Sequence, residues 1–136
     1  ANMYLVSVKN IFSKVIDATT FEALANSKSE DEAKQALGNL FQNMLNAMTS
    51  KNTMLEQAIY FATFSDEIVK DITNTMSALT QEHVIKMSQF QYENGKQDMA
   101  KEIKKIFDEF LINMLNATAT VFENHGYKID RQSLGL

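Results

Sequence analysis

The side chains best suited to acid–base or metal chemistry in this chain are its two histidines, His83 and His125. Neither stands in the His-x-x-x-His or Glu-x-x-His spacing that would place two metal ligands on one face of a helix. The chain also has no cysteine, so thiol chemistry and disulfides are excluded. Hydrogen bonding at a helix C-terminus is a sufficient role for His125. The sequence therefore predicts no catalytic residue, no metal site and no cofactor site.

The acidic residues are explained by helix formation. Glu30-Asp-Glu32 and Asp66-Glu67 stand where helices are expected to begin, and negative charge is favourable there. Lys104-Lys105 and Asp108-Glu109 form two pairs four residues apart on one expected helix face. No glycine-rich phosphate loop, nucleophile elbow or Ser-His-Asp candidate appears. These patterns predict a protein that is not an enzyme.

Composition limits the remaining classes. The chain has 136 residues, 45% of them apolar, which suits one globular domain, and we expect residues 1–136 to be a domain cut from a longer polypeptide. A net charge of −4 argues against nucleic acid as a partner. No apolar run approaches the ~20 residues that cross a bilayer, so no membrane partner is expected.

Apolar residues recur at steps of three and four along almost the whole chain, and proline is absent. No segment shows the alternation expected of a strand. The sequence therefore predicts an all-α fold, a single bundle of five to six helices. The expected helices cover residues 3–17, 20–26, 30–48, 53–64, 68–79 after a restart or kink at 65–67, 84–90 and 99–124.

Capping signals set several of these boundaries. Ser29–Glu32 and Thr53–Glu56 both match the capping box, in which the first side chain accepts from a backbone N–H and the second returns the bond. Asn94–Gly95 and Asn124–Gly126 are expected left-handed caps. Gly38, inside the second long helix, is expected to permit close approach of a neighbouring helix. Tyr127 and Ile129 could then fold back on the bundle before a polar tail.

A repeated segment supports this architecture. Residues 39–50 and 109–120 share Asn-Met-Leu-Asn-Ala, and both carry apolar residues at helical spacing. Leu45 and Leu115 occupy matching positions, so both are expected in the core. The other residues expected to face inward include Phe12, Phe21, Leu24, Ala33, Ala36, Leu37, Leu40, Phe41, Met44, Met48, Met54, Leu55, Ala58, Ile59, Phe61, Ala62, Phe64, Val84, Ile85 and Met87.

The C-terminal segment resembles the end of the helical repeat domains of spider silk proteins, the spidroins. The residues that carry the likeness are Phe110–Asn116, the small residues through Ala119, His125–Asp130 and Ser133. Upstream, residues 18–26 look like the short helical entry of those domains. The chain departs from the family in its many lysines, acids and asparagines, which would make it a hydrophilic member. The resemblance carries over no catalytic or ligand residues.

The resemblance implies a structural, non-enzymatic module of a secreted silk-type protein. Such a module would keep a long chain soluble in storage and mediate its assembly into fibre or glue, through self-association or through other domains of the same protein. The alternative is a small intracellular bacterial helical adaptor, such as a secretion chaperone or an immunity protein, in the cytoplasm. Asn116-Ala-Thr118 matches a glycosylation sequon, but inside an expected helix a chance match explains it.

Overall fold

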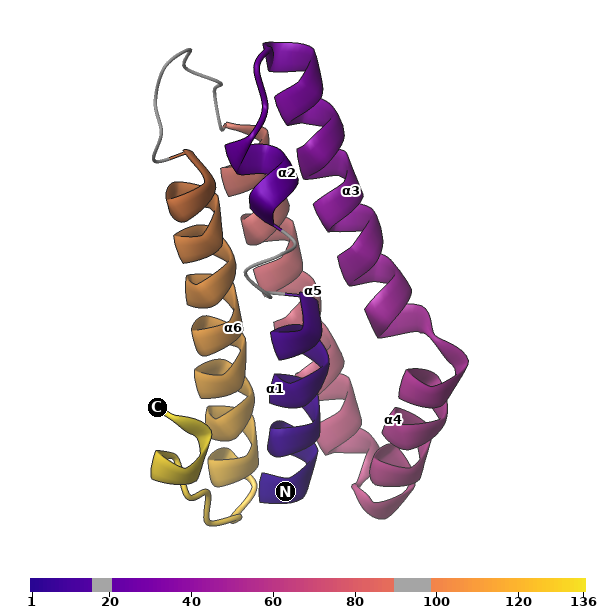
Figure 1. Ribbon diagram of the computed structural model, residues 1–136. Coiled ribbons are helices and arrows are strands. Elements are labelled where there is room, and N and C mark those ends of the chain that lie inside the picture. Colours follow the sequence, from indigo (N-terminus) through magenta and orange to yellow (C-terminus); the bar gives the residue numbers. More distant parts are fainter. Residues whose placement is uncertain (16–20, 90–98) are drawn as a thin grey trace.

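The described parts of the fold are mainly helices (Figure 1). A computed structural model describes residues 1–15, 21–89 and 99–136. Within those ranges there are six α-helices and no strand, which confirms the predicted all-α bundle. The helices are α1 (Asn2–Val15), α2 (Glu22–Ala25), α3 (Glu30–Thr49), α4 (Lys51–Thr63), α5 (Asp66–Ser88) and α6 (Met99–Asn124), and a 3₁₀ turn η2 (Gln132–Leu134) follows.

The helices α5 and α6 run side by side along the length of the molecule, α1 lies against their lower half with the short α2 above it, and α3 and α4 follow one another along the other side (Figure 1). The most extensive contact joins α5 to α6, while α1 packs on both α3 and α6. The short helix α2 touches α3 and α6, and α4 touches α3 and α1. The helix α4 therefore lies at the edge of the bundle.

Serine caps set the beginnings of α3, α4 and α5. Ser29 Oγ accepts from the backbone N–H of Glu32 at 3.2 Å, as the first capping box predicts. The Glu32 carboxylate, however, accepts from the N–H of Lys28 at 2.7 Å, one residue before the cap. Ser65 caps α5 by accepting from the N–H of Ile68 at 3.3 Å, which confirms the predicted restart.

The second predicted capping box is wrong. Ser50 is the N-cap of α4 and accepts from the N–H of Thr53 at 3.3 Å, so Thr53 lies inside the helix. The Thr53 hydroxyl donates to the carbonyl oxygen of Ala47 in α3 at 2.8 Å. Because Ser50 alone separates α3 from α4, it serves as the cap of both. Glu56 bonds to α1 instead.

Residues 84–88 of the helix predicted over residues 84–90 are the last part of α5, which runs without a break from Asp66 to Ser88, and residue 90 lies outside the described residues. Nothing between Leu79 and Val84 interrupts a helix, so one long element is favoured. Val84 and Ile85 are exposed, which corrects their assignment to the core, whereas Met87 is buried. The cap predicted at Asn94–Gly95 lies outside the described residues.

The left-handed cap predicted at Asn124–Gly126 is confirmed. Gly126 has φ +90°, its N–H donates to the carbonyl of Glu123, and the N–H of Tyr127 donates to the carbonyl of Phe122, both at 3.0 Å. This pair of bonds is a Schellman motif. Gly38 is different. A Cβ there would meet nothing within 4 Å, so the predicted close approach of a neighbouring helix is wrong.

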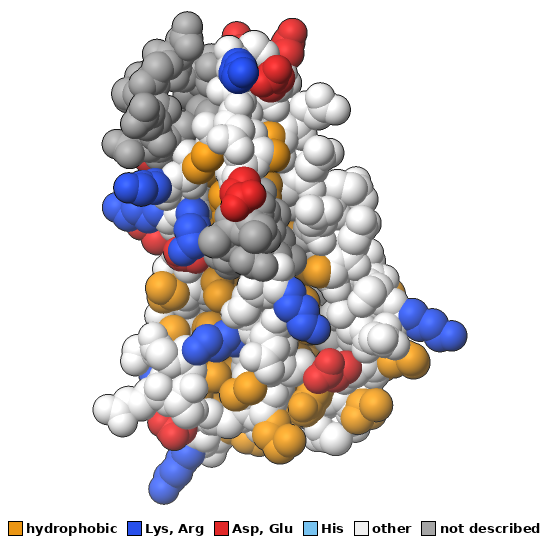
Figure 2. Space-filling view, in the orientation of Figure 1, with side chains coloured by type: hydrophobic (Ala, Val, Ile, Leu, Met, Phe, Trp, Pro, Cys, Tyr) orange, Lys and Arg blue, Asp and Glu red, His pale blue; other side chains and the backbone are white. Residues whose placement is uncertain are grey.

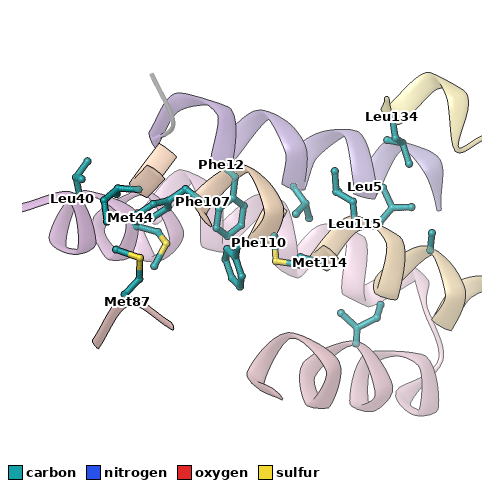
Figure 3. Close-up of a cluster of buried hydrophobic side chains, with 14 of the residues drawn as sticks. Leu5, Phe12, Leu40, Met44, Met87, Phe107, Phe110, Met114, Leu115 and Leu134 are labelled. Carbon is teal, nitrogen blue, oxygen red and sulfur yellow. The ribbon is translucent and has the colours of Figure 1, made fainter. Parts of the chain in front are cut away.

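The core joins side chains from α1, α3, α5 and α6 (Figure 3). Leu115 in α6 is 2% exposed, but its sequence twin Leu45 in α3 is 49% exposed, so the prediction for Leu45 is wrong. The helix α6 has the most extensive contact of the bundle, with α5, in addition to α1 and α2, whereas α3 makes only smaller contacts with α1, α2 and α4. Two helices of matching sequence thus bury different widths of surface.

The chain after α6 folds back on the bundle as predicted. Tyr127 packs its ring on Phe64 and Phe122, with centroids 6.4 Å and 5.6 Å away, and Ile129 is half-buried against the core. The sequence predicts a polar tail after this segment, but the tail also contributes an apolar side chain to the core. Leu134 in η2 is only 2% exposed, and it points back toward α1 (Figure 3). The C-terminal turn therefore closes one end of the core.

Candidate functional site

The two histidines lie in separate environments. His83 is buried on α5, and the Nε2 atom of His125 lies 2.9 Å from the carboxylate of Asp71 on α5. The prediction for His125 placed it at a helix end, and the structure adds a bond that ties this end of α6 to α5. Within the described ranges, no three His, Asp or Glu side chains gather in a way that could hold a metal ion.

His83 is enclosed by aromatic rings. Its imidazole stacks on Phe110, with centroids 4.3 Å apart and planes 20° apart, and meets Phe107 edge-on at 4.7 Å. Neither ring nitrogen has a hydrogen-bond partner among the described residues. Burial, helped by the positive charge of Lys86, lowers the pKa of His83 to about 4. At neutral pH it is therefore an uncharged core side chain.

The space beside His83 is too small for a substrate. A crevice lined by Glu82, Lys86, Asn113 and neighbouring apolar side chains has a volume of about 10 Å³. That is room for about one water molecule. Such a water could reach an imidazole nitrogen that has no protein partner. The crevice has no room for a larger molecule.

The C-terminal residues that carry the spidroin resemblance form a polar clasp on the start of α1. The side-chain amide of Asn2 donates to the backbone oxygen of Asp130 and to the hydroxyl of Ser133, both at 3.1 Å. The N–H of Asp130 donates back to the Asn2 side chain at 2.9 Å. Lys9 donates to the carbonyl of Leu134 at 3.0 Å. These bonds hold the first and last elements together at one end of the bundle.

Arg131, the single arginine, ties the same segment to α6. Its guanidinium donates to the side-chain oxygen of Asn116 at 2.8 Å, to the hydroxyl of Thr120 at 3.1 Å, and to the carboxylate of Glu123. Asn116 of the sequon thus lies within α6 with its side-chain oxygen bound to Arg131. Asn116 is the second asparagine of the repeated motif Asn-Met-Leu-Asn-Ala. Only the copy in α6 binds Arg131, because Arg131 follows α6 in the chain.

The surface feature that sequence analysis missed is an apolar face on α4. Met54, Leu55 and Ile59 are 58%, 54% and 69% exposed, so their expected inward placement is wrong. Ala58 and Ala62 are exposed too, while Phe61 and Phe64 are half-buried against the core. Apolar residues surround most of this helix, so periodicity could not distinguish its inner face from its outer one.

A groove joins this helix to α1. It has a volume of about 300 Å³ and is lined by Asn2, Met3, Val6, Ser7, Asn10, Glu56, Tyr60 and Ser133. Met3 is 72% exposed and Val6 38%, so the apolar surface continues from α4 onto α1. The Ser7 hydroxyl donates to the Glu56 carboxylate at 2.8 Å and fixes the two walls. Figure 2 shows hydrophobic side chains gathered at this end, over the start of α1 and along α4.

These observations define a helical bundle in which His125 is bound to Asp71, His83 is packed among aromatic rings, and an apolar face of α4 is exposed. Neither a protein-family model, nor a curated protein, nor a solved structure matches the chain. Within the described residues, none of the helices has the length and apolar character that crossing a membrane requires.

Proposed function

We propose that this chain is a structural, non-enzymatic module of a secreted silk-type protein, which keeps the longer polypeptide soluble in storage and mediates its assembly. The observation that carries the proposal is the exposed apolar face of α4, which continues onto α1 beside a well-filled core. An apolar patch of this kind is typical of a site of association. The module would associate with itself or with other domains of the same protein.

The division of apolar residues supports both parts of this function. Storage requires that most apolar side chains be hidden, and 21 hydrophobic residues of the described part of the chain are buried in the core. Assembly requires that some remain available, and Met54, Leu55 and Ile59 are more than half exposed. A core of this size stabilises the folded chain, and the small exposed apolar surface allows reversible association at high concentration.

The residues that carry the spidroin resemblance support the same proposal, since each has a structural task. Asn116 receives Arg131, Gly126 allows the left-handed turn, and Asp130 and Ser133 bind Asn2. A motif made of such residues closes a bundle. This is the role that the resemblance implies for the segment.

Light scattering as the pH is stepped from about 7 to about 5 tests the proposal. Acidification favours the charged form of His83, which the buried site disfavours, so it should loosen the core and expose apolar surface for association. We expect the mass at high protein concentration to exceed that of one chain and to rise on acidification. A single-chain mass throughout would contradict the function. The flanking coding sequence gives a second test: repetitive Gly-, Ser- and Ala-rich flanks support a silk protein, and a start and a stop codon at the two ends support the intracellular adaptor.

A further inference from the structure

The outer face of α4 combines large and small apolar side chains in regular rows. Met54, Ala58 and Ala62 follow one another at steps of four, and Leu55 and Ile59 form a second row beside them. All five are exposed, although the opposite side of the same helix packs on α3 and α1. Alanines between larger residues leave hollows into which side chains of a facing helix can pack. The face thus has both protrusions and hollows.

We propose that this face is a two-fold interface with α4 of a second copy of the chain, with the two helices antiparallel. The inference rests on the proposed function and assigns the surface through which self-association occurs. In a two-fold interface each surface must fit itself. An antiparallel crossing centred on Ala58 satisfies this requirement, because Met54 of one copy then faces Ala62 of the other.

The charges at the two ends of α4 select this orientation and favour a second copy as the occupant. Lys51 is exposed in the first turn of α4, and Asp66 and Glu67 are exposed just beyond its last turn. An antiparallel pair brings Lys51 of each copy toward the acids of the other, and also toward the negative end of the partner's helix dipole. A parallel pair would place like charges together, so electrostatic complementarity sets the direction.

The apolar area available agrees with a weak dimer. The exposed parts of Met54, Leu55 and Ile59 amount to on the order of 350 Å² for each copy, against about 800 Å² in a standard interface. Polar residues at the rim, including Lys51, supply the remainder. We therefore expect an equilibrium between monomer and dimer that depends on concentration, with fast exchange.

The first experiment compares two isoleucine substitutions in the whole chain by sedimentation equilibrium. Ile59→Glu places a charge beside Ala58 in the interface, once from each copy, and we expect the dissociation constant to rise roughly 100-fold or more. The matched control is Ile85→Glu, on the exposed face of α5, where the native side chain is 56% exposed. It should leave the dissociation constant unchanged. Equal association of Ile59→Glu and the unaltered chain would overturn the proposed surface.

The second experiment exchanges the charges. Lys51→Glu alone, and Asp66→Lys with Glu67→Lys as a double variant, should each dimerise more weakly because like charges then meet at both ends. Mixed in equal amounts, the two variants should form a heterodimer in which both ends are complementary again. Circular dichroism of each variant confirms that it is folded. Mixing without any gain in mass would show that α4 does not pair in this orientation.

The outcomes separate this inference from the function on which it rests. Association that persists in Ile59→Glu leaves a self-assembling module but assigns it another surface. A single-chain mass for the unaltered protein, at millimolar concentration and at every pH tested, contradicts self-association and this interface together. Dimerisation that Ile59→Glu abolishes, and Ile85→Glu does not, supports both.

Discussion

The imidazole of His83 lies nearly flat on the ring of Phe110, with the ring centroids 4.3 Å apart and the planes inclined by 20°. The two residues come from α5 and α6, the pair of helices with the most extensive contact in the bundle. A titratable group therefore lies within the principal helix interface. Because its nitrogens have no hydrogen-bond partner among the described residues, only the neutral form suits the site.

The first prediction follows from the pKa of His83, which burial lowers from 6.5 to about 4 in the folded protein. Because the unfolded chain binds this proton more readily, the contribution of His83 to stability is complete above about pH 6.5 and is lost as the pH falls toward 4. We expect a loss of roughly 3 kcal/mol in the free energy of unfolding over that range. Urea denaturation at several pH values measures it.

The control for this prediction is His83→Phe, which keeps an aromatic ring between Phe107 and Phe110 but cannot titrate. Carboxylates also change charge over the same range, so the difference between variant and unaltered protein isolates the histidine. The variant should lose less stability on acidification. Two parallel curves of stability against pH would show that His83 is not the responsible group.

The second prediction concerns the twin leucines. Leu115→Ala should lower the free energy of unfolding by about 2–5 kcal/mol, because it leaves a cavity in the core. Leu45→Ala removes a side chain that is 49% exposed, and we expect a loss below about 1 kcal/mol. Chemical denaturation of both variants tests the difference. Equal losses would mean that α3 buries the same width of surface as α6.

The third prediction concerns Tyr4, whose ring packs against Tyr60, Phe61, Phe64 and Phe122 with centroids 5.6–5.9 Å away. Its hydroxyl is buried, has no hydrogen-bond partner among the described residues, and has its pKa raised by burial. Tyr4→Phe removes that polar atom, so we expect thermal unfolding to show a gain of about 1 kcal/mol. The half-buried Tyr60 is the comparison, and Tyr60→Phe should change stability by less than about 0.5 kcal/mol. A clear loss in Tyr4→Phe would reveal a partner for the hydroxyl.

The fourth prediction contrasts two glycines. Gly126→Ala should cost about 1 kcal/mol, because a residue with a Cβ is strained at the observed φ of +90°. Gly38→Ala should instead stabilise α3 by up to about 1 kcal/mol, since the site is helical and nothing lies within 4 Å of the added carbon. Thermal melts of the two variants should shift in opposite directions. A loss on Gly38→Ala would restore the close helix approach that the sequence suggested.

Local signals predicted most of the fold. The Ser29 and Ser65 caps, the turn at Gly126 and the long apolar stripe of α6 were all readable, because each depends on residues within a turn or two of one another. The boundary at Ser50 was missed although its signal is local too. Thr53 offered a competing hydroxyl three residues later, and only the fold of the α3–α4 junction shows which of the two forms the cap.

The sequence by itself determined that the chain is helical, where most helices begin and end, and that its histidines do not form a spaced ligand pair. The tertiary structure alone decided which apolar faces are covered. Leu45 and Leu115 share a local sequence, and α4 is apolar on most of its sides. In these helices the local sequence therefore does not indicate which face a neighbouring helix covers. Burial depends on which helices surround a face, and that depends on contacts between residues far apart in the chain. For this reason the candidate association surface on α4 became visible only in the folded bundle.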